Sequence, residues 1–162
     1  MYYALILRLL VLLTLANGSP VVAKWLFGNR FAPPLDADKK FADGRPIFGR
    51  SKTLRGLCLS LLVTAGSAPL FGFPMKIGLL IAATAMAGDL FSSFLKRRLG
   101  LLPGDAAPGL DQIPESLFPL LAASSALSLT VLDIFAGTAL FAVAALVSSR
   151  LLFKLHVRDK TL

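Results

Sequence analysis

The chain has 162 residues, the length of a single domain, yet 56% of them are hydrophobic and only 16% are charged. A mean hydropathy of +0.73 excludes an ordinary water-soluble globule and predicts a protein whose solvent is the lipid bilayer. The formal charge of +8 comes from basic residues in the gaps between apolar stretches. This distribution argues against nucleic-acid binding and favours loops that face anionic headgroups or an anionic substrate.

Cysteine and histidine chemistry is nearly absent, because Cys58 and His156 are the only residues of their types. A single cysteine cannot form an intrachain disulfide or a thiolate metal cluster. A single histidine in a basic tail argues against His-rich zinc sites and against Ser-His or Cys-His catalysis. Catalysis by this chain would therefore depend on acidic and basic side chains.

The first apolar stretch covers residues 2–22, about the length that a helix needs to cross a hydrocarbon core of about 30 Å. The segment Asn17-Gly18-Ser19-Pro20 is expected to interrupt its second half. The alternative interpretation of this stretch is a cleaved signal peptide, but no basic segment precedes its apolar core.

Two further apolar stretches each contain more residues than one membrane-spanning helix needs. Residues 54–95 are expected to fold back near Pro69, Gly72 and Pro74, and residues 117–153 to turn near Asp133. Together with the first stretch they predict an all-α fold, a polytopic membrane bundle with five transmembrane helices. The whole chain, residues 1–162, is expected to form one integral-membrane domain.

The basic residues predict the orientation of this bundle. With five crossings, 15 of the 17 Lys and Arg residues fall on one side, and only Arg8 and Lys76 fall toward the other. The positive-inside rule then places the N-terminus outside, and the C-terminus and two loops, about 24–53 and 96–115, in the cytoplasm. The expected location is the inner (cytoplasmic) membrane, with the active site facing the cytoplasm.

Asp89 is the clearest sign of chemistry, since apolar helix flanks it on both sides. A carboxylate in lipid is costly, so Asp89 should face the bundle interior and have a cationic partner. Ser92, Ser93 and Lys96 follow on the same helical face, and Lys96 is expected to reach back toward the carboxylate. The alternative is that the basic residues 96–98 only stabilise the helix end and stop translocation.

Asp111 lies just before the fourth predicted span, at the membrane depth of the end of the third. It could therefore approach Asp89 from a neighbouring helix. Two carboxylates from adjacent helices, without a usable His or Cys, suit Mg²⁺. The alternative is that Asp111 is an ordinary helix N-cap. For the glycine-rich first loop, the alternative to phosphate binding is a charged, solvated loop.

An ordered series of short motifs between residues 17 and 112 resembles the CDP-archaeol synthase family of CTP-dependent cytidylyltransferases, and is similar in part to phosphatidate cytidylyltransferases. In chain order the motifs are Asn17 and Pro20; Pro34 and Asp36; Asp43-Gly44-Arg45; Lys52-Thr53-Leu54-Arg55-Gly56; Gly88-Asp89 and Ser93; Lys96-Arg97-Arg98; and Asp111-Gln112.

The resemblance implies an enzyme that transfers CMP from CTP to a lipid phosphate, either 2,3-di-O-geranylgeranylglyceryl phosphate or a similar glycerolipid phosphate, and releases pyrophosphate. It implies Mg²⁺ as cofactor, bound by Asp89 and Asp111, and CTP, the lipid phosphate and the membrane as partners. A homo-oligomer is compatible with the sequence. The implied catalytic residues are Lys52, Asp89, Lys96 and Asp111. The implied substrate-binding residues are Asn17, Asp36, Asp43, Gly44, Arg45, Thr53, Arg55, Ser93, Arg97, Arg98 and Gln112.

Two other functions remain open at the level of sequence. A CDP-alcohol phosphotransferase also uses Mg²⁺ and an Asp-Gly element, but its family pattern needs further aspartates along one helix, whereas Pro46 and basic residues follow Asp43-Gly44 here. The second is a non-enzymatic membrane transporter or scaffold whose basic loops bind anionic lipid headgroups.

Overall fold

A computed structural model describes residues 3–105 and 107–154, and the secondary-structure elements within these residues are all helices, which confirms the predicted all-α class. The basic residues Arg158 and Lys160 of the predicted cytoplasmic tail, and His156, lie outside the described residues. The helices are α1 (Tyr3–Phe27), α2 (Leu54–Ser67), the short 3-10 helix η1 (Ala68–Phe71), α3 (Met75–Arg98), α4 (Gln112–Leu127) and α5 (Val131–Lys154).

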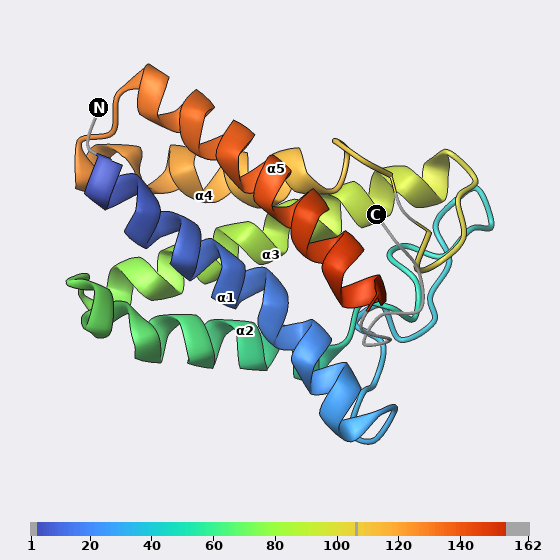
Figure 1. Ribbon diagram of the computed structural model, residues 1–162. Coiled ribbons are helices and arrows are strands. Elements are labelled where there is room, and N and C mark those ends of the chain that lie inside the picture. The colour runs from blue at the N-terminus through green and yellow to red at the C-terminus, as the bar shows by residue number, and fades with distance from the viewer. Residues whose placement is uncertain (1–2, 106, 155–162) are drawn as a thin grey trace.

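The five α-helices run alternately in opposite directions (Figure 1). The short connections between α2 and α3 and between α4 and α5 lie at one end of the bundle, beside the start of α1. Both long loops, residues 28–53 and 99–111, lie at the opposite end. The charged segments that are far apart in the sequence therefore meet at a single end of the bundle.

Within the part of the chain that the structure describes, four helical segments are long and apolar enough to cross a membrane: Tyr3–Phe27, Leu54–Phe71, Met75–Arg98 and Val131–Ser148. The fifth helix, α4, has 16 residues, about 24 Å of helix, which is shorter than a hydrocarbon core of about 30 Å. It ends at Leu127 because the next residue, Ser128, has left-handed backbone angles (φ 52°). The predicted bundle of five helices is confirmed; of the five helices that the sequence predicts as transmembrane, four are long and apolar enough to span a membrane.

The expected interruption of the first helix at Asn17 to Pro20 is wrong, because α1 continues through Pro20 to Phe27. A proline inside a helix removes the hydrogen bond to the carbonyl four residues earlier, here that of Ala16. The hydroxyl of Ser60, on α2, donates to this carbonyl at 2.8 Å. A neighbouring helix thus satisfies the acceptor that Pro20 leaves open, and α1 need not break.

Replacing Ser60 by alanine should therefore destabilise the protein, because the buried carbonyl of Ala16 would lose this donor. We expect a loss of about 1–2 kcal/mol, measured as a lower thermal unfolding midpoint in detergent micelles. Ser124→Ala is the matched control, since the Ser124 hydroxyl donates to Leu121 of its own helix. Equal unfolding midpoints for the two variants would contradict this role for Ser60.

The two predicted turns are confirmed. Between α2 and α3 the chain reverses through η1, with Gly72 in the left-handed region (φ 78°) and Pro74 at the N-cap of α3. Between α4 and α5, Asp133 accepts hydrogen bonds from the backbone N–H and the hydroxyl of Thr130, at 3.0 and 2.7 Å, and Asp133 N–H donates to the Thr130 hydroxyl at 3.2 Å. This reciprocal arrangement caps the start of α5 and accounts for an acid in an otherwise apolar stretch.

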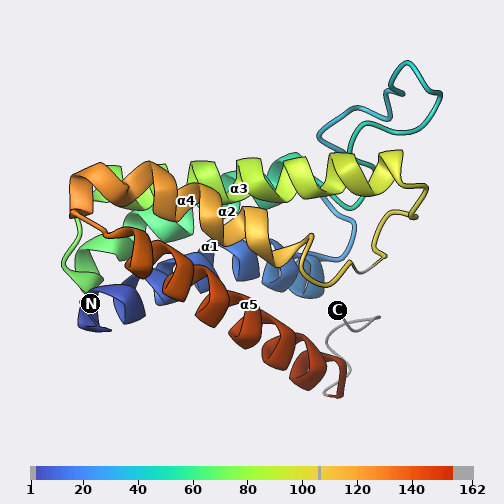
Figure 2. The same ribbon diagram turned by 90° about the horizontal axis from the view of Figure 1, so that it is seen from above.

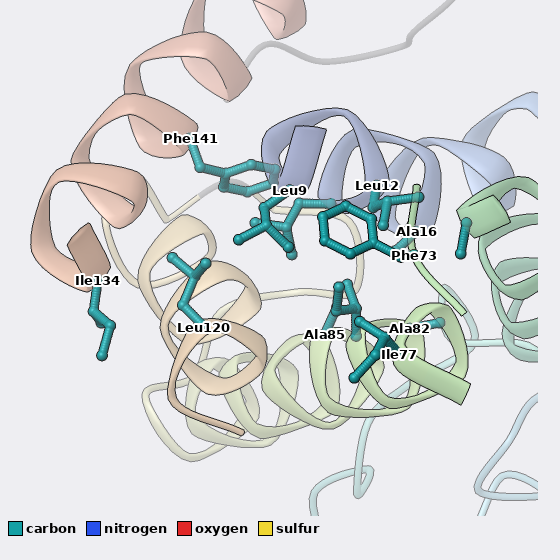
Figure 3. Packing of buried hydrophobic residues seen from close by; sticks show 13 residues of the cluster. Leu9, Leu12, Ala16, Phe73, Ile77, Ala82, Ala85, Leu120, Ile134 and Phe141 are labelled. Carbon is teal, nitrogen blue, oxygen red and sulfur yellow. The ribbon is translucent and has the colours of Figure 1, made fainter. Parts of the chain in front are cut away.

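Helix α3 is central to the bundle and contacts α1, α2 and α4. Its small and branched side chains pack with leucines of α1, while Leu120, Ile134 and Phe141 extend the core toward α4 and α5 (Figure 3). Helix α5 packs on α4 and α1, and its later turns diverge from the other helices (Figure 2). The central position of α3 brings residues 88–97 between the first loop and the start of α4.

Candidate active site

The first loop inserts a lysine into the end of the bundle that carries the loops. Lys52 Nζ lies 2.5 and 2.6 Å from the two carboxylate oxygens of Asp89, with side chains 23% and 17% exposed. Burial lowers the pKa of Lys52, but the carboxylates of Asp89 and Glu115 more than offset this effect and raise the pKa, so the ammonium stays charged. The prediction that Asp89 has a cationic partner is confirmed.

A second, more deeply buried pair lies beside the first. Lys96 Nζ is 2.6 Å from Asp111 Oδ1, and these side chains are 10% and 9% exposed. Lys96 also donates to the Asp105 carbonyl at 3.1 Å. Lys96 interacts electrostatically with Asp89, as expected, but its own ion pair is with Asp111, and the ion pair of Asp89 is with Lys52.

Asp111 stands at the N-cap position of α4 but does not cap the helix with its side chain. Its Oδ2 accepts from Ala107 N–H at 3.0 Å, in the loop that precedes the helix. Gln112 Oε1 accepts from Gly109 N–H at 2.6 Å and stabilises the same loop. The N-cap alternative for Asp111 is therefore wrong, since its carboxylate binds Lys96 and the loop backbone instead.

Glu115, in the first turn of α4, is a site residue that sequence reasoning missed. Its carboxyl is hydrogen-bonded to that of Asp89. The close approach depends on Gly88: a Cβ built there would lie 2.2 Å from the carbonyl oxygen of Pro114 and 2.9 Å from the backbone nitrogen of Glu115. Two features could have drawn attention to Glu115: it is the only glutamate of the chain, and it follows Asp111 by one helical turn.

Backbone pairing holds Lys52 in place. Leu35 N–H donates to the Lys52 carbonyl at 2.8 Å, and Leu54 N–H donates to the Pro33 carbonyl at 3.0 Å. Thr53 caps α2 by accepting from Gly56 N–H at 3.2 Å. The lysine is thus fixed on both sides, by an extended pairing before it and by a helix start after it.

Asp36 organises the same loop. Its Oδ2 accepts from the N–H groups of Phe48 and Gly49 at 2.9 and 2.8 Å, and its Oδ1 accepts from Asp38 N–H at 3.2 Å. Burial raises the pKa of Asp36, but the bonds from Gly49, Phe48 and Asp38 outweigh burial and leave the pKa below its usual value. The carboxylate therefore stays charged and holds the chain turn that leads to Lys52.

Arg55 is bound to the end of α1. Its guanidinium donates to the carbonyl of Gly28 at 2.9 Å and to that of Arg30, and it lies over the Phe27 ring at 5.9 Å. Further back on α1, the Asn17 amide donates to the Leu13 carbonyl at 3.1 Å. Arg55 and Asn17, both predicted to bind substrate, thus donate hydrogen bonds to carbonyls of α1 or of the residues that follow it, rather than to Asp89 or Glu115.

The remaining predicted residues divide into two groups. Ser93 and Arg97 are buried, at 2% and 3% exposure; on α3, Ser93 lies between Asp89 and Lys96, and Arg97 follows Lys96 directly. The second group lies where the tip of the first loop contacts the last turn of α3, and it comprises Asp43, Gly44, Arg45 and Arg98.

The acidic side chains fit Mg²⁺ as a partial ligand set. Asp89 and Glu115 bring two carboxyl groups together, and Mg²⁺ is commonly bound by one or two carboxylates together with substrate phosphates and water. The proton that these two groups share in their hydrogen bond would leave when the metal ion binds. Across residues 3–105 and 107–154, no three His, Cys, Asp or Glu side chains form a ready-made metal site. The donors therefore suit an ion that arrives with a phosphate-bearing substrate.

Comparison with known families gives one match. A family model described as CarS-like CDP-archaeol synthase matches residues 67–161. This range contains both acids of the contacting pair, the two buried partners Lys96 and Asp111, and the connecting loop.

Individual relatives carry the same description. A CDP-archaeol synthase of Pyrobaculum calidifontis is 34% identical over 154 residues, which covers 90% of this chain and 89% of the relative. The proteins of that name from Hyperthermus butylicus and Pyrococcus furiosus are 39% and 42% identical, each over 60% of this chain. These two matches span 59% and 60% of the relatives' own lengths.

A solved structure has a similar fold. It is described as an intramembrane enzyme for archaeal membrane lipid biosynthesis, and its sequence is 30% identical to this chain. The superposition has a TM-score of 0.75 and covers 87% of this chain and 90% of that one.

Proposed function

Because the chain belongs to the CDP-archaeol synthase family, we propose that it transfers CMP from CTP to a membrane lipid phosphate. The products would be a CDP-activated lipid and pyrophosphate. The preferred acceptor would be an archaeal-type 2,3-di-O-geranylgeranylglyceryl phosphate or a similar glycerolipid phosphate. The observation that carries this proposal is the contact between Lys52, Asp89 and Glu115 at the end of a bundle of apolar helices.

The reaction suits a site without a histidine base. An oxygen of the lipid phosphate forms a bond to the α-phosphorus of CTP, while the bond to the bridging oxygen breaks and pyrophosphate leaves with that electron pair. A phosphate monoester has its second pKa near 6, so at neutral pH the attacking oxygen is already anionic. The protein's task is therefore to bring two anions together and to neutralise their charge.

Two lysines, the half-buried Lys52 and the buried Lys96, supply that charge. Lys52 and Lys96 lie in adjacent ion pairs, and a phosphate that enters between them would exchange one carboxylate partner for another anion. Asp89 and Glu115 would hold Mg²⁺ delivered with the nucleotide. Asp111, which the sequence suggested as the second metal ligand, would instead keep Lys96 at the border of this site, because its carboxylate is bound to Lys96 and to Ala107 N–H. When bound, the metal ion neutralises phosphate charge and favours departure of pyrophosphate.

The charged end of the bundle supports one orientation in the membrane. Both long loops lie at one end (Figure 1), and together with the adjoining ends of α1, α2 and α3 they carry 11 of the 17 basic residues. We place this end in the cytoplasm, where CTP is available, and the start of α1 on the outer side of the inner membrane. The lipid phosphate would then present its headgroup at the cytoplasmic boundary while its chains stay in the bilayer.

Purified protein incubated with CTP labelled at the α-phosphate tests this function. We expect label in the lipid and an equal amount of pyrophosphate, only when both CTP and a lipid phosphate are present. A CDP-alcohol phosphotransferase would require a CDP-lipid instead of CTP, and a scaffold would produce neither product. A panel of ether and ester glycerophosphates of both stereochemistries would then identify the acceptor.

A further inference from the structure

The tip of the first loop is fastened to the last turn of α3 by a group that we name the loop clamp: Phe41, Asp43, Arg45, Phe94 and Arg98. The guanidinium carbon of Arg98 lies 4.9 Å from the centre of the Phe41 ring and 4.8 Å from that of Phe94. The two rings meet edge to face, with their centres 5.3 Å apart. Arg98 therefore contacts one aromatic ring from the loop and one from the helix.

The polar atoms of Arg98 also bind the loop. Its Nη1 donates to Asp43 Oδ1 at 2.9 Å, and its Nη2 donates to the Pro46 carbonyl at 2.5 Å. The Arg98 side chain is only 19% exposed. Both terminal nitrogens are thus used within the protein, and little of the guanidinium remains open to a ligand.

Arg45 makes the reciprocal contact from the loop to the helix. Its Nη1 donates to the carbonyls of Arg97 and Arg98, at 3.2 and 2.5 Å. The last carbonyls of a helix have no partner within the helix, so Arg45 caps α3. Asp43 Oδ1 also accepts from Arg45 N–H at 3.0 Å, and this bond fixes the loop tip.

We propose that Arg98 is a positioning residue, which holds the first loop against α3 so that Lys52 meets Asp89, and that it does not bind the substrate phosphates. Lys52 follows Asp43 by nine residues, and Asp89 precedes Arg98 by nine. Loop and helix therefore run side by side in opposite directions between two points of attachment, about 14 Å apart along the helix axis. The effect on catalysis rests on the function proposed above, whereas the attachment of the loop does not.

The test compares Arg98→Gln, Asp43→Asn and the double variant with the wild type. Arg50→Gln is the matched control, because Arg50 is an arginine of the same loop whose ion pair with Asp38 is solvent-exposed. Hydrogen exchange of residues 41–53, measured without nucleotide, reports the attachment directly. Steady-state kinetics with CTP then separates kcat from KM.

We expect faster exchange over residues 41–53 in both single variants and none of this change in Arg50→Gln. The kcat should fall by about tenfold to a hundredfold, while KM for CTP stays within about twofold of the wild-type value. The double variant should be little worse than Arg98→Gln, since both changes break the ion pair between Arg98 and Asp43. Asp43→Asn removes no positive charge, so its agreement with Arg98→Gln would exclude a loss of phosphate binding.

Three results would overturn the proposal: unchanged exchange in Arg98→Gln, faster exchange with unchanged kcat, or a rise in KM for CTP that exceeds the fall in kcat. If the wild type transfers no CMP, the function proposed above fails. The exchange data would still decide whether Arg98 attaches the loop.

Discussion

Replacing Asp89 by asparagine should abolish transfer of CMP from CTP to lipid. The neutral amide cannot balance the charge of Lys52, which lies 2.5 Å from the carboxylate, and it is a far weaker ligand for a divalent cation. We expect kcat to fall by at least about a thousandfold, measured with CTP labelled at the α-phosphate.

A loss of folding must be separated from this loss of chemistry, because Asp89→Asn leaves the partly buried Lys52 without its carboxylate partner. Combining it with Lys52→Met removes the unpaired charge, and this double variant should regain stability without regaining activity. Asp38→Asn is the matched control, since it removes an exposed aspartate that pairs with Arg50. Full activity of folded Asp89→Asn would refute the role of this carboxylate.

Gly88→Ala should have the second largest effect. The added methyl group would lie 2.2 Å from the carbonyl oxygen and 2.4 Å from the carbonyl carbon of Pro114. Both are backbone atoms, so the first turn of α4 must move away from α3 and carry Glu115 from Asp89. We expect a loss of about 1–3 kcal/mol in stability and about a hundredfold in kcat.

Gly66→Ala is the control for this prediction. Gly66 lies in α2, and a Cβ there meets no atom within 4 Å. The substitution should leave activity unchanged and raise stability by up to about 1 kcal/mol, because alanine favours a helix over glycine. The thermal unfolding midpoint and kcat are measured for both variants. Equal midpoints and equal kcat values in Gly88→Ala and Gly66→Ala would show that the contact between Gly88 and Pro114 does not position Glu115.

The helical framework could be predicted because its signals are local. Stretch length, apolar composition and the turn residues Pro69, Gly72 and Pro74 are sufficient to place the two hairpins. The continuation of α1 through Pro20 was not predictable in this way. It depends on Ser60, 40 residues later in the chain, which supplies the missing donor.

The sequence predicts which residues belong to the site better than it predicts which of them form ion pairs or hydrogen bonds with each other. Spacing along one helix suggested that Lys96 serves Asp89, but the actual partner, Lys52, comes from a loop whose path depends on Asp36 and on the loop clamp. Glu115 was not predicted as a site residue, because an acid in the first turn of a helix is commonly explained by the helix dipole alone. Its contact with Asp89 becomes visible only once Gly88 brings the two helices together.

Binding of Mn²⁺, as a spectroscopic substitute for Mg²⁺, tests the central claim most directly. Its dissociation constant can be measured by electron paramagnetic resonance on the purified protein with CTP, for the wild type, Asp89→Asn and Glu115→Gln. We predict at least about tenfold weaker binding in each variant. Equal affinity in all three proteins would contradict the claim that these two carboxylates receive the ion that accompanies the nucleotide.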